Sequence, residues 1–485
     1  MTTLMGWYPR WRRGMVRATV KPTRLSTIRR ATRAILILSL VVLVAPSTMA
    51  SPASPSALSS PDPASAASPS PVASQTAAPT AAPTTAPAIA PTRTPLAPSG
   101  SPPAYTVPTG PAVEIPTLGI AMSATDATRR ALTSRLGTLR ATYGLPGVSA
   151  AILFPDGTMW RATSGFADVA ARRRLTADTE FAVASISKSF LAALILRLVE
   201  EGKVGLDTAV APYLPDVVID PGITVRQLLD HTSGLHDYFY DPDIDKELLA
   251  DRTRVWTATD ALGYVGKPYF EPGAGWHYSN TNYVILGLLA ETVEGVPLAE
   301  QFRTRFLAPF GLDHTHYQGV EKPRGPLARA YRFSGPGLRL RPIPLSDGTN
   351  VVPFTSVVTA AGSAGSVAST ADDLVTWARA LYGGSVLTPA SLAAMVGDVS
   401  LTASFEPSIP YGLGVQAATI DGRPTLGHSG RLLGSRTVMR WLPDHGIAIA
   451  VLTNQSRNDP NLVARALLRV VLGTPIECAS CPSLQ

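Results

Sequence analysis

Cysteine and histidine, on which many redox and metal sites depend, are scarce in this sequence. Of 485 residues only two are cysteines, Cys478 and Cys481, and both lie within the last eight residues. They could close a small disulfide loop or remain idle thiols, and without a βαβ context they do not indicate a thioredoxin-like redox site. The seven histidines are scattered, and the close pair His314 and His316 lacks a helical His-Glu-x-x-His context. A metal centre is therefore not expected.

Acidic residues are absent from the first 50 residues, which contain nine of the 42 Lys and Arg residues. The formal net charge of the whole chain is +7, so removing these nine leaves 7 − 9 = −2 for the rest. The basic character therefore belongs to the leading segment. Because nucleic-acid-binding domains carry their positive charge on a folded surface, no nucleic-acid partner is expected.

The leading segment has the parts of an export signal. Its basic residues precede an apolar run of twelve residues, Ala34–Ala45, which only Ser39 interrupts, and the polar stretch Pro46–Ala50 follows. Extending the apolar run to Met49 would also permit an uncleaved membrane anchor. We expect residues 1–50 to be a cleaved signal, with a retained anchor as the alternative. The sequence therefore predicts an extracytoplasmic protein, secreted or tethered to the cell envelope, that meets a membrane only through this segment if it is uncleaved.

The next segment, residues 51–118, has few charged and few large apolar side chains. It contains 17 of the 44 prolines among Ala, Ser and Thr, and only three charged residues. Such a composition cannot bury enough apolar surface to offset the entropy of ordering, so we expect a disordered linker. The remainder divides into a folded domain, residues 119–475, and a tail, residues 476–485, that holds the Cys-x-x-Cys pair. At about 350 residues the folded part is long enough for one large core with a smaller inserted domain.

Predicted strands lie near both ends of the folded domain, with predicted helices before, between and after them. The early strands are Gly147–Phe154 and Met159–Ser164, joined by the turn Pro155–Thr158. The late strands are Tyr411–Thr419, Thr425–His428, Arg436–Trp441 and Ile447–Leu452. The predicted helices are Ala124–Tyr143, Ile186–Glu201, Thr281–Val293, Leu298–Phe306, Thr370–Tyr382, Pro389–Val396 and Asn461–Leu472. This order predicts an α/β (α+β) fold with one antiparallel sheet flanked by helices, which the chain leaves for an inserted all-helical domain and then rejoins.

The first candidate for chemistry is a serine and a lysine, Ser185 and Lys188, where a buried helix begins. Three residues apart on a helix, they lie on one face. A serine hydroxyl becomes a good nucleophile only when a neighbouring base takes its proton. A lysine can be that base when burial and the positive end of a helix dipole lower its pKa, and the apolar run Phe190–Val199 supplies the burial. The alternative role for Ser185 is a plain helix N-cap.

Two further groups of polar residues stand at the ends of predicted elements. Tyr278 and Asn280 precede another helix; a tyrosinate can share the base role, and an Asn amide can bind a substrate carbonyl and hold a lysine. His428 and Ser429 lie at the end of a predicted strand and offer donors to a substrate carboxylate or carbonyl, and Gly430 would let a substrate backbone approach closely. Taken singly, each group could be an ordinary turn.

Together the three groups resemble a known active-site signature. Their order, with 93 residues from Ser185 to Tyr278 and 150 from Tyr278 to His428, is similar to that of the family that joins D-alanyl-D-alanine carboxypeptidases, class C β-lactamases and related esterases. The resemblance covers Ala124–Gly473. The stretches that share it outside the three groups include His231–Leu235, which reads His-Thr-Ser-Gly-Leu, and the Gly-rich Ala361–Asp373.

The resemblance implies a penicillin-recognising serine hydrolase that works through an acyl-enzyme, with no cofactor and no metal. The implied catalytic residues are Ser185 as the acylated nucleophile, with Lys188 and Tyr278 sharing proton transfer. The implied substrate-binding residues are Asn280, His428, Ser429 and Gly430. The implied oxyanion hole uses the backbone N–H groups of Ser185 and Arg431. The expected substrate is a small molecule or a peptidoglycan peptide, and the expected reaction is D-alanyl-D-alanine carboxypeptidase-like or related amide or ester hydrolysis.

One departure from the family pattern bears on the substrate. β-Lactamases of this group usually carry Lys at the position of His428, whereas His is familiar there among DD-peptidases, D-amino-acid peptidases and esterases. A histidine holds a full charge only when its pKa is raised, so efficient β-lactam turnover is not expected. The alternatives within the family are a β-lactamase, a carboxylesterase, and a penicillin-binding sensor or cell-wall-binding module that does not turn over.

An unrelated alternative is an α/β-hydrolase that uses Ser363. The segment Ala361–Gly365 is a degenerate nucleophile elbow, but its first Gly is replaced and the parallel βαβ rhythm is missing. We expect His231 and His236 to have a structural role, holding a loop by hydrogen bonds.

Overall fold

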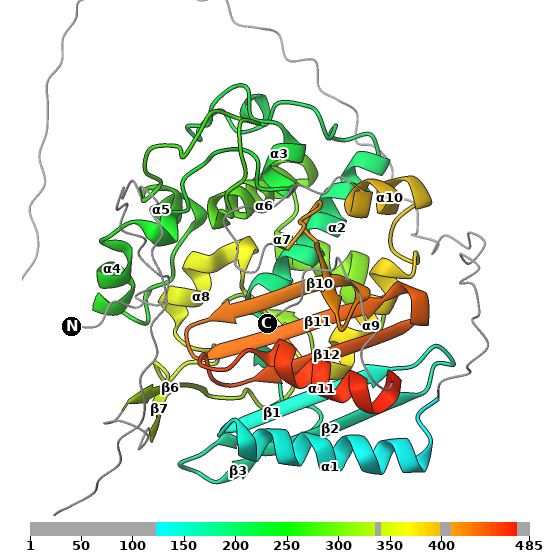
Figure 1. The fold of residues 1–485 in the computed structure, drawn as a ribbon. Helices are drawn as coiled ribbons and strands as arrows, with labels where there is room; N and C mark the ends of the chain where they lie inside the picture. The colour runs from blue at the N-terminus through cyan, green and yellow to red at the C-terminus, as the bar shows by residue number, and fades with distance from the viewer. Residues whose placement is uncertain (1–122, 335–340, 398–408, 473–485) are drawn as a thin grey trace, which may run out of the picture. The chain divides into compact units, whose positions relative to one another are not determined.

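The structure is a computed structural model that describes residues 123–334, 341–397 and 409–472 (Figure 1). The predicted export segment, linker and tail, with Cys478 and Cys481, lie outside these ranges. Within them, no helix combines the length and the apolar character needed to cross a membrane.

The main sheet has seven strands, is antiparallel throughout, and contains strands from the beginning and from the end of the folded domain (Figure 1). Its strands are β1 (Gly147–Leu153), β2 (Met159–Asp168), β3 (Arg173–Arg174), β9 (Gln416–Ile420), β10 (Arg423–Leu432), β11 (Ser435–Leu442) and β12 (Ile447–Thr453). The order across the sheet is β3-β2-β1-β12-β11-β10-β9, so early and late strands meet where β1 pairs with β12. This topology confirms the predicted fold class.

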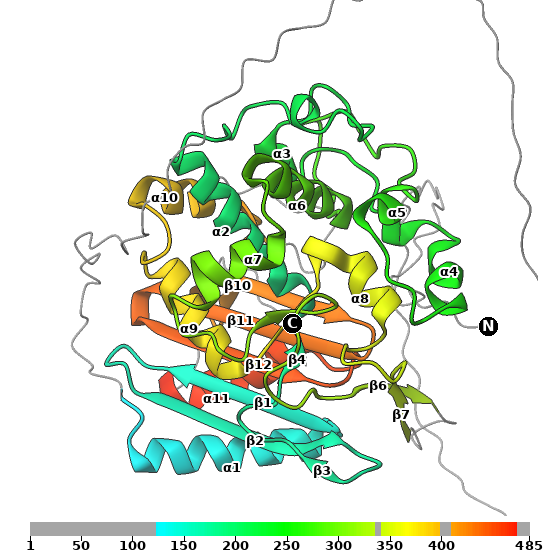
Figure 2. The ribbon, with the colours of Figure 1, turned by 180° about the vertical axis from the view of Figure 1, so that it is seen from behind.

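Helices cover both faces of the sheet, which explains why every position of its central strands β1 and β12 is buried and nearly every one is apolar. On β12, Ile449 and Val451 face the cluster formed with α1 (Asp126–Thr142) and α11 (Pro460–Leu472). The intervening residues, such as Ala450, face α9 (Ala371–Tyr382), which Figure 2 shows on the opposite side of the sheet. Side chains alternate between faces along a strand, so a strand buried on both faces needs an unbroken apolar run.

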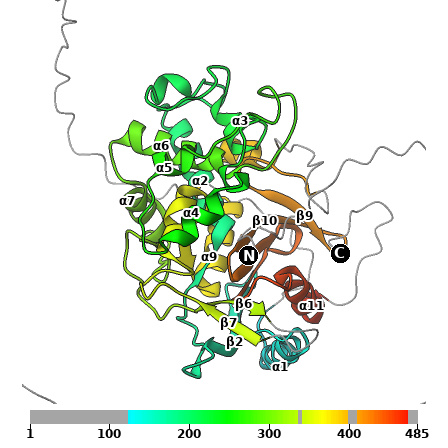
Figure 3. The same ribbon diagram turned by 90° about the vertical axis from the view of Figure 1, so that its left-hand side faces the viewer.

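The chain between β3 and β9 forms the inserted part (Figures 1 and 3). Its helices besides α9 are α2 (Ser187–Glu200), α3 (Val225–Leu229), α4 (Ile244–Ala250), α5 (Ala258–Leu262), α6 (Asn280–Glu294), α7 (Leu298–Phe302), α8 (Thr355–Ala361) and α10 (Pro389–Gly397). Its strands are β4 (Phe181–Ala182), β5 (His316–Tyr317) and β8 (Val367–Ser369), which form one small sheet, and β6 (Ala330–Ser334) and β7 (Arg341–Leu345), which form another. The insert is therefore mainly but not wholly helical, unlike the all-helical domain predicted.

The sequence analysis missed several short helices of the insert, among them α3 and α5, which depend on their caps. α3 and α5 have five residues each, too few to show an apolar period. Thr224 and Thr257 begin them with capping boxes, in which the threonine side chain and the third helical residue satisfy each other's backbone N–H groups.

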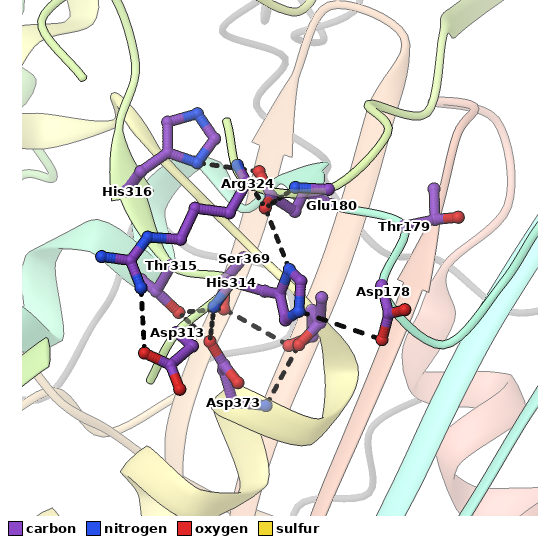
Figure 4. Close-up of polar contacts among 12 residues, drawn as sticks. Asp178, Thr179, Glu180, Asp313, His314, Thr315, His316, Arg324, Ser369 and Asp373 are labelled. Carbon is purple, nitrogen blue, oxygen red and sulfur yellow. Dashed lines mark hydrogen bonds and ion pairs between the residues drawn. The ribbon is translucent and has the colours of Figure 1, made fainter. Parts of the chain in front are cut away.

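A buried carboxylate, Glu180, fastens the strand that leads into Ser185 (Figure 4). Its Oε1 accepts the backbone N–H groups of Gly325 at 2.7 Å and Arg324 at 3.1 Å. The imidazoles beside the carboxylate are those of His314, with Nδ1 3.3 Å from Oε1, and His316, with Nδ1 2.9 Å from Oε2. Since Glu180 directly precedes β4, these contacts fix the point from which the chain turns toward Ser185.

Candidate active site

Ser185 lies on a single 3-10 turn, Ala184–Ile186, between β4 and α2. Ala184 has a φ of 51°, a left-handed conformation that costs a residue with a Cβ atom about 1 kcal/mol. Ser187 holds the turn: its Oγ donates to the Ala184 carbonyl at 2.6 Å and accepts the Val367 N–H at 3.0 Å. The strained turn leaves Ser185 partly exposed while the residues around it are buried.

Lys188 begins α2 one turn after Ser185 and is completely buried. Its Nζ lies 3.3 Å from Ser185 Oγ. The same amine donates to Asn280 Oδ1 at 2.8 Å and to the Ala364 carbonyl at 2.8 Å. The structure therefore brings the predicted nucleophile, the predicted base and Asn280 into direct contact.

Burial lowers the pKa of Lys188 to about 7, against the opposing effect of the Asp237 carboxylate. The amine also faces two aromatic rings, 4.9 Å from the centroid of Tyr278 and 5.2 Å from that of Tyr283. Such faces favour the ammonium form, but loss of hydration is the larger effect. Near neutral pH a large fraction of Lys188 is uncharged and able to accept the Ser185 proton.

Tyr278 and Asn280 stand at the start of α6, as the sequence indicates. Ser279 occupies the N-cap position without a side-chain cap hydrogen bond, and its backbone N–H donates to His231 Nδ1 at 3.2 Å. His236 Nδ1 accepts the N–H of Gly266 at 3.1 Å, so both histidines hold loops, which confirms the structural role expected for them. Tyr278 packs against His231, with ring centroids 4.3 Å apart, and this places its ring beside the lysine.

Asp237 belongs to the site, although the sequence analysis did not single it out. Its Oδ2 accepts the Asn280 Nδ2–H at 2.9 Å, and the residue is 2% exposed. Burial raises the pKa of Asp237 to about 6. The signal in the sequence is its place two residues after the His-Thr-Ser-Gly-Leu stretch, but an aspartate there also reads as a turn cap, and Oδ1 does accept the Phe239 N–H at 3.1 Å.

His428 lies on β10 facing the lysine, and it is neutral. Burial, and after it the nearby Lys188 charge, lower the pKa of His428 to about 3. Its Nδ1 lies 2.7 Å from the Ser429 carbonyl and Nε2 lies 2.9 Å from Tyr411 Oη. The carbonyl can only accept, so Nδ1 carries the hydrogen and Nε2 accepts from the tyrosine. The position at which related β-lactamases carry a lysine thus holds no charge.

The side chain of Ser429 does contact a cation, the guanidinium of Arg440, which the sequence analysis missed. Arg440 on β11 is completely buried, and its Nη2 donates to Ser429 Oγ at 3.0 Å and to Gln416 Oε1 at 2.9 Å. Burial lowers the pKa of Arg440 to about 10, so it stays charged at neutral pH. Because Ser429 Oγ accepts from the guanidinium, its own hydrogen is directed elsewhere, and Ser429 itself is partly exposed.

Gly430 lets β10 pack against the turn that carries the nucleophile. A Cβ atom there would lie 2.0 Å from the Val183 carbonyl oxygen and 2.3 Å from Thr437 Oγ1. A glycine is therefore needed here for packing within the protein, in addition to the close approach of a substrate that the sequence predicts. β9 pairs with β10 only up to Gly427, so Arg431, which is exposed, lies beyond that pairing. The oxyanion hole of Ser185 and Arg431 backbone groups stays a prediction.

The alternative nucleophile Ser363 has a structural role. Its Oγ donates to the Tyr283 carbonyl at 2.7 Å on a 3-10 turn, and the main sheet is antiparallel, whereas a nucleophile elbow needs a parallel α/β sheet. The α/β-hydrolase alternative is therefore wrong. Across the described ranges, no group of three or more His, Cys, Asp or Glu side chains could hold a metal ion.

Comparisons with known proteins agree with this geometry. The chain is 30% identical over 329 residues to penicillin-binding protein 4* of Bacillus subtilis (strain 168), covering 66% of this chain and 71% of that protein. It is 26% identical over 356 residues to a D-aminopeptidase of Cereibacter sphaeroides (strain ATCC 17029 / ATH 2.4.9), covering 72% of this chain and 63% of that protein. Among solved structures, the D-amino acid amidase from Ochrobactrum anthropi SV3 superposes with a TM-score of 0.60 at 26% identity, covering 71% of this chain and 98% of the amidase.

The relatives thus include penicillin-binding proteins and hydrolases of D-amino-acid compounds, and the fold of the solved neighbour is that of the domain described above. The family profile described as Beta-lactamase matches residues 130–473, which spans every residue of the site. The chain belongs to the Beta-lactamase family, whose members are serine hydrolases of this fold.

Proposed function

We propose that the chain is a D-alanyl-D-alanine carboxypeptidase-like hydrolase that forms an acyl-enzyme on Ser185 outside the cytoplasmic membrane. The contact between Ser185 and a buried lysine supports the mechanism. In acylation Ser185 Oγ attacks the carbonyl carbon, its proton passes to neutral Lys188, and the C–N bond breaks. The leaving amine takes the proton through Lys188 and Tyr278. Water then hydrolyses the ester, which releases the acid and restores Ser185.

The choice of substrate rests on one observation, the cation behind Ser429. A peptide that ends in D-alanyl-D-alanine carries a carboxylate next to the bond that breaks. Arg440 directs the Ser429 hydroxyl hydrogen toward the open side, where a carboxylate could accept it. The Asp459 carboxylate acts on the guanidinium electrostatically, and Arg440 stays charged at neutral pH. His428 is neutral, so Arg440 is the charge that would favour an anionic group there. The positive charge of Arg440 also disfavours binding of a substrate whose ammonium group would lie next to Ser429.

A second candidate, hydrolysis of D-amino acid amides, is favoured by the similarity to the D-amino acid amidase and D-aminopeptidases. The two candidates differ in the charge that each substrate presents. A matched pair of peptides separates them: an N-acylated peptide ending in D-alanyl-D-alanine, and the same peptide with its terminal carboxylate converted to an amide. We expect the free carboxylate to give the higher kcat/KM. Faster hydrolysis of the capped peptide or of D-phenylalanine amide would favour the second candidate.

The first experiment is intact-mass spectrometry of the purified protein after incubation with a penicillin, beside the Ser185→Ala variant. A stable adduct that the variant lacks supports a penicillin-recognising peptidase with Ser185 as nucleophile. Hydrolysed drug without an adduct indicates a β-lactamase, and an adduct with no peptide turnover indicates a sensor. If neither an adduct nor hydrolysed drug is found, esters and D-amino acid amides are the substrates to assay next.

A further inference from the structure

Four side chains form a continuous polar chain from a buried carboxylate to the nucleophile. Asp237 Oδ2 accepts from Asn280 Nδ2 at 2.9 Å, Asn280 Oδ1 accepts from Lys188 Nζ at 2.8 Å, and Lys188 Nζ lies 3.3 Å from Ser185 Oγ. Asp237 and Lys188 are both buried, whereas Asn280 between them is partly exposed. Ser185 and Lys188 act in the proposed acylation, and the sequence analysis gives Asn280 a substrate-binding role, whereas the carboxylate has no assigned role.

We propose that Asp237 is a positioning residue that acts on Lys188 through Asn280: it fixes which end of the amide faces the lysine, and it places a negative charge behind the amine. This inference rests on the proposed function, because it assumes that Lys188 is the base for Ser185.

The first part of the proposal concerns the orientation of the amide. The oxygen and nitrogen of an Asn side chain have nearly the same shape, so their hydrogen-bond partners decide which way the amide points. An ionised carboxylate can only accept, so the Asn280 NH2 group must face Asp237. The Asn280 oxygen then has to face Lys188. A neutral amide in place of Asp237 removes this constraint and lets Asn280 turn a donor toward the amine.

The second part concerns charge. Two hydrogen bonds in series place the carboxylate about 7 Å from the lysine nitrogen, where an opposite charge at an effective dielectric constant near 20 raises a pKa by about one to two units. Burial lowers the pKa of Lys188 to about 7, and Asp237 is the group that opposes this effect. The pKa of Asp237 is about 6, so its carboxylate is ionised at neutral pH. Without it, burial would lower the lysine pKa further, and a weaker base would face Ser185.

The other titratable groups around Lys188 come from three elements. Tyr278 and Tyr283 face it from the start of α6, His231 from the loop after α3, and His428 from β10. Burial lowers the pKa of both histidines far enough to keep them neutral. Among the described residues, Asp237 is therefore the anion that acts on the lysine at neutral pH.

The test measures the lysine directly, by NMR titration of protein labelled with 13C at the lysine ε-carbon. The chain has six lysines, and the Lys188 signal is the one absent from the Lys188→Met variant. We expect Asp237→Asn to lower the pKa of Lys188 by about one unit. The matched control is Asp243→Asn, which removes an exposed carboxylate on the same segment and should leave that pKa unchanged.

The acid limb of kcat/KM with a simple ester should move to lower pH by the same amount in Asp237→Asn. A folded Asp237→Asn protein whose Lys188 pKa stays within about 0.3 unit of the parent, or rises, overturns the proposal even if activity falls. The NMR titration uses no substrate, so it can be read even if the chain proves not to act on D-alanyl-D-alanine peptides.

If Asp237→Asn does not fold, the proposal is tested by the reciprocal measurement, which is the pKa of Asp237 in the Lys188→Met variant. Coupling between two ionisable groups is mutual, so removing the lysine charge in Lys188→Met must raise the pKa of Asp237 by a similar amount. Aspartate labelled with 13C at the carboxyl carbon reports this shift. An unchanged Asp237 pKa contradicts the proposal, and a rise of about one unit supports it.

Discussion

Replacing Lys188 by methionine should make the protein inactive and, at neutral pH, more stable. Lys188 is completely buried, and burial lowers its pKa from 10.5 to about 7. Methionine has a similar length, no charge and a flexible chain that fills irregular space. The variant therefore removes the cost of holding an amine away from water while it keeps most of the packing.

The sign and size of the effect follow from proton linkage. Between pH 7 and 10.5 the unfolded chain binds more protons at this lysine than the folded one, so the stability of the parent protein rises with pH across this window. At pH 6 the cost of burial is nearly complete, and by pH 9 much of it has gone, a change of about 2–3 kcal/mol. The hydrogen bonds to Asn280 and Ala364 contribute an opposing term of about 1–2 kcal/mol that varies little with pH.

The assay is urea unfolding of the parent and of Lys188→Met at several pH values from 6 to about 9. We expect the free energy of unfolding of the variant minus that of the parent to decrease by about 2–3 kcal/mol as pH rises over this range. The matched control is Lys203→Met: against the opposing effect of burial, hydrogen bonds to Glu201 and Glu294 raise the pKa of Lys203, so this amine stays charged across the range. A difference that does not change with pH would refute the assignment of a strongly lowered lysine pKa.

Four further outcomes are expected. The rate of Ser185 acylation by an ester should rise with pH through about 7, because Lys188 must be neutral to accept the proton, and a rate independent of pH from 6 to about 8 would contradict this role. Arg440→Met should raise KM about tenfold or more for a carboxylate-ended peptide and leave the amide-capped peptide nearly unaffected, as steady-state kinetics on both will show. Glu180→Gln should lower the free energy of unfolding by about 1–3 kcal/mol, measured in urea, because an amide nitrogen would replace the carboxylate oxygen that faces either the backbone donors or His316 Nδ1. Gly430→Ala should abolish adduct formation, since its Cβ atom would lie 2.0 Å from the Val183 carbonyl oxygen, and normal labelling by mass spectrometry would show that β10 can move.

The sequence predicts the parts of the site that depend on local spacing. Ser185 and Lys188 are one helical turn apart whatever surrounds them, and the apolar run after them indicates that the helix is buried. The two early strands and the four late strands follow from alternation and turn residues. Their union into one antiparallel sheet follows from the order of the elements, and the structure confirms it.

The missed residues depend on contacts between distant segments. Asp237 meets Asn280 across 43 positions, and in the sequence it is an ordinary turn aspartate. Arg440 lies within a predicted strand, but only the register of β10 against β11 brings it to Ser429. The neutrality of His428 likewise depends on burial beside Lys188, which motif spacing does not disclose.

The pairing of β1 with β12 has a consequence for how the chain becomes an enzyme. Val148 and Thr453 are partners in the sheet although about 300 residues separate them along the chain, and contacts of such separation form slowly because a long loop must close first. A ribosome must have released the last strand before the centre of the sheet can assemble. Until then β11, whose Thr437 Oγ1 donates to the Val183 carbonyl at 3.0 Å, has no β12 to pair with, so the support that it gives the Ser185 turn is not anchored in the sheet. We therefore expect a newly synthesised chain to stay inactive until β12 has been made, and a chain that ends before Ile447 to lack an active site.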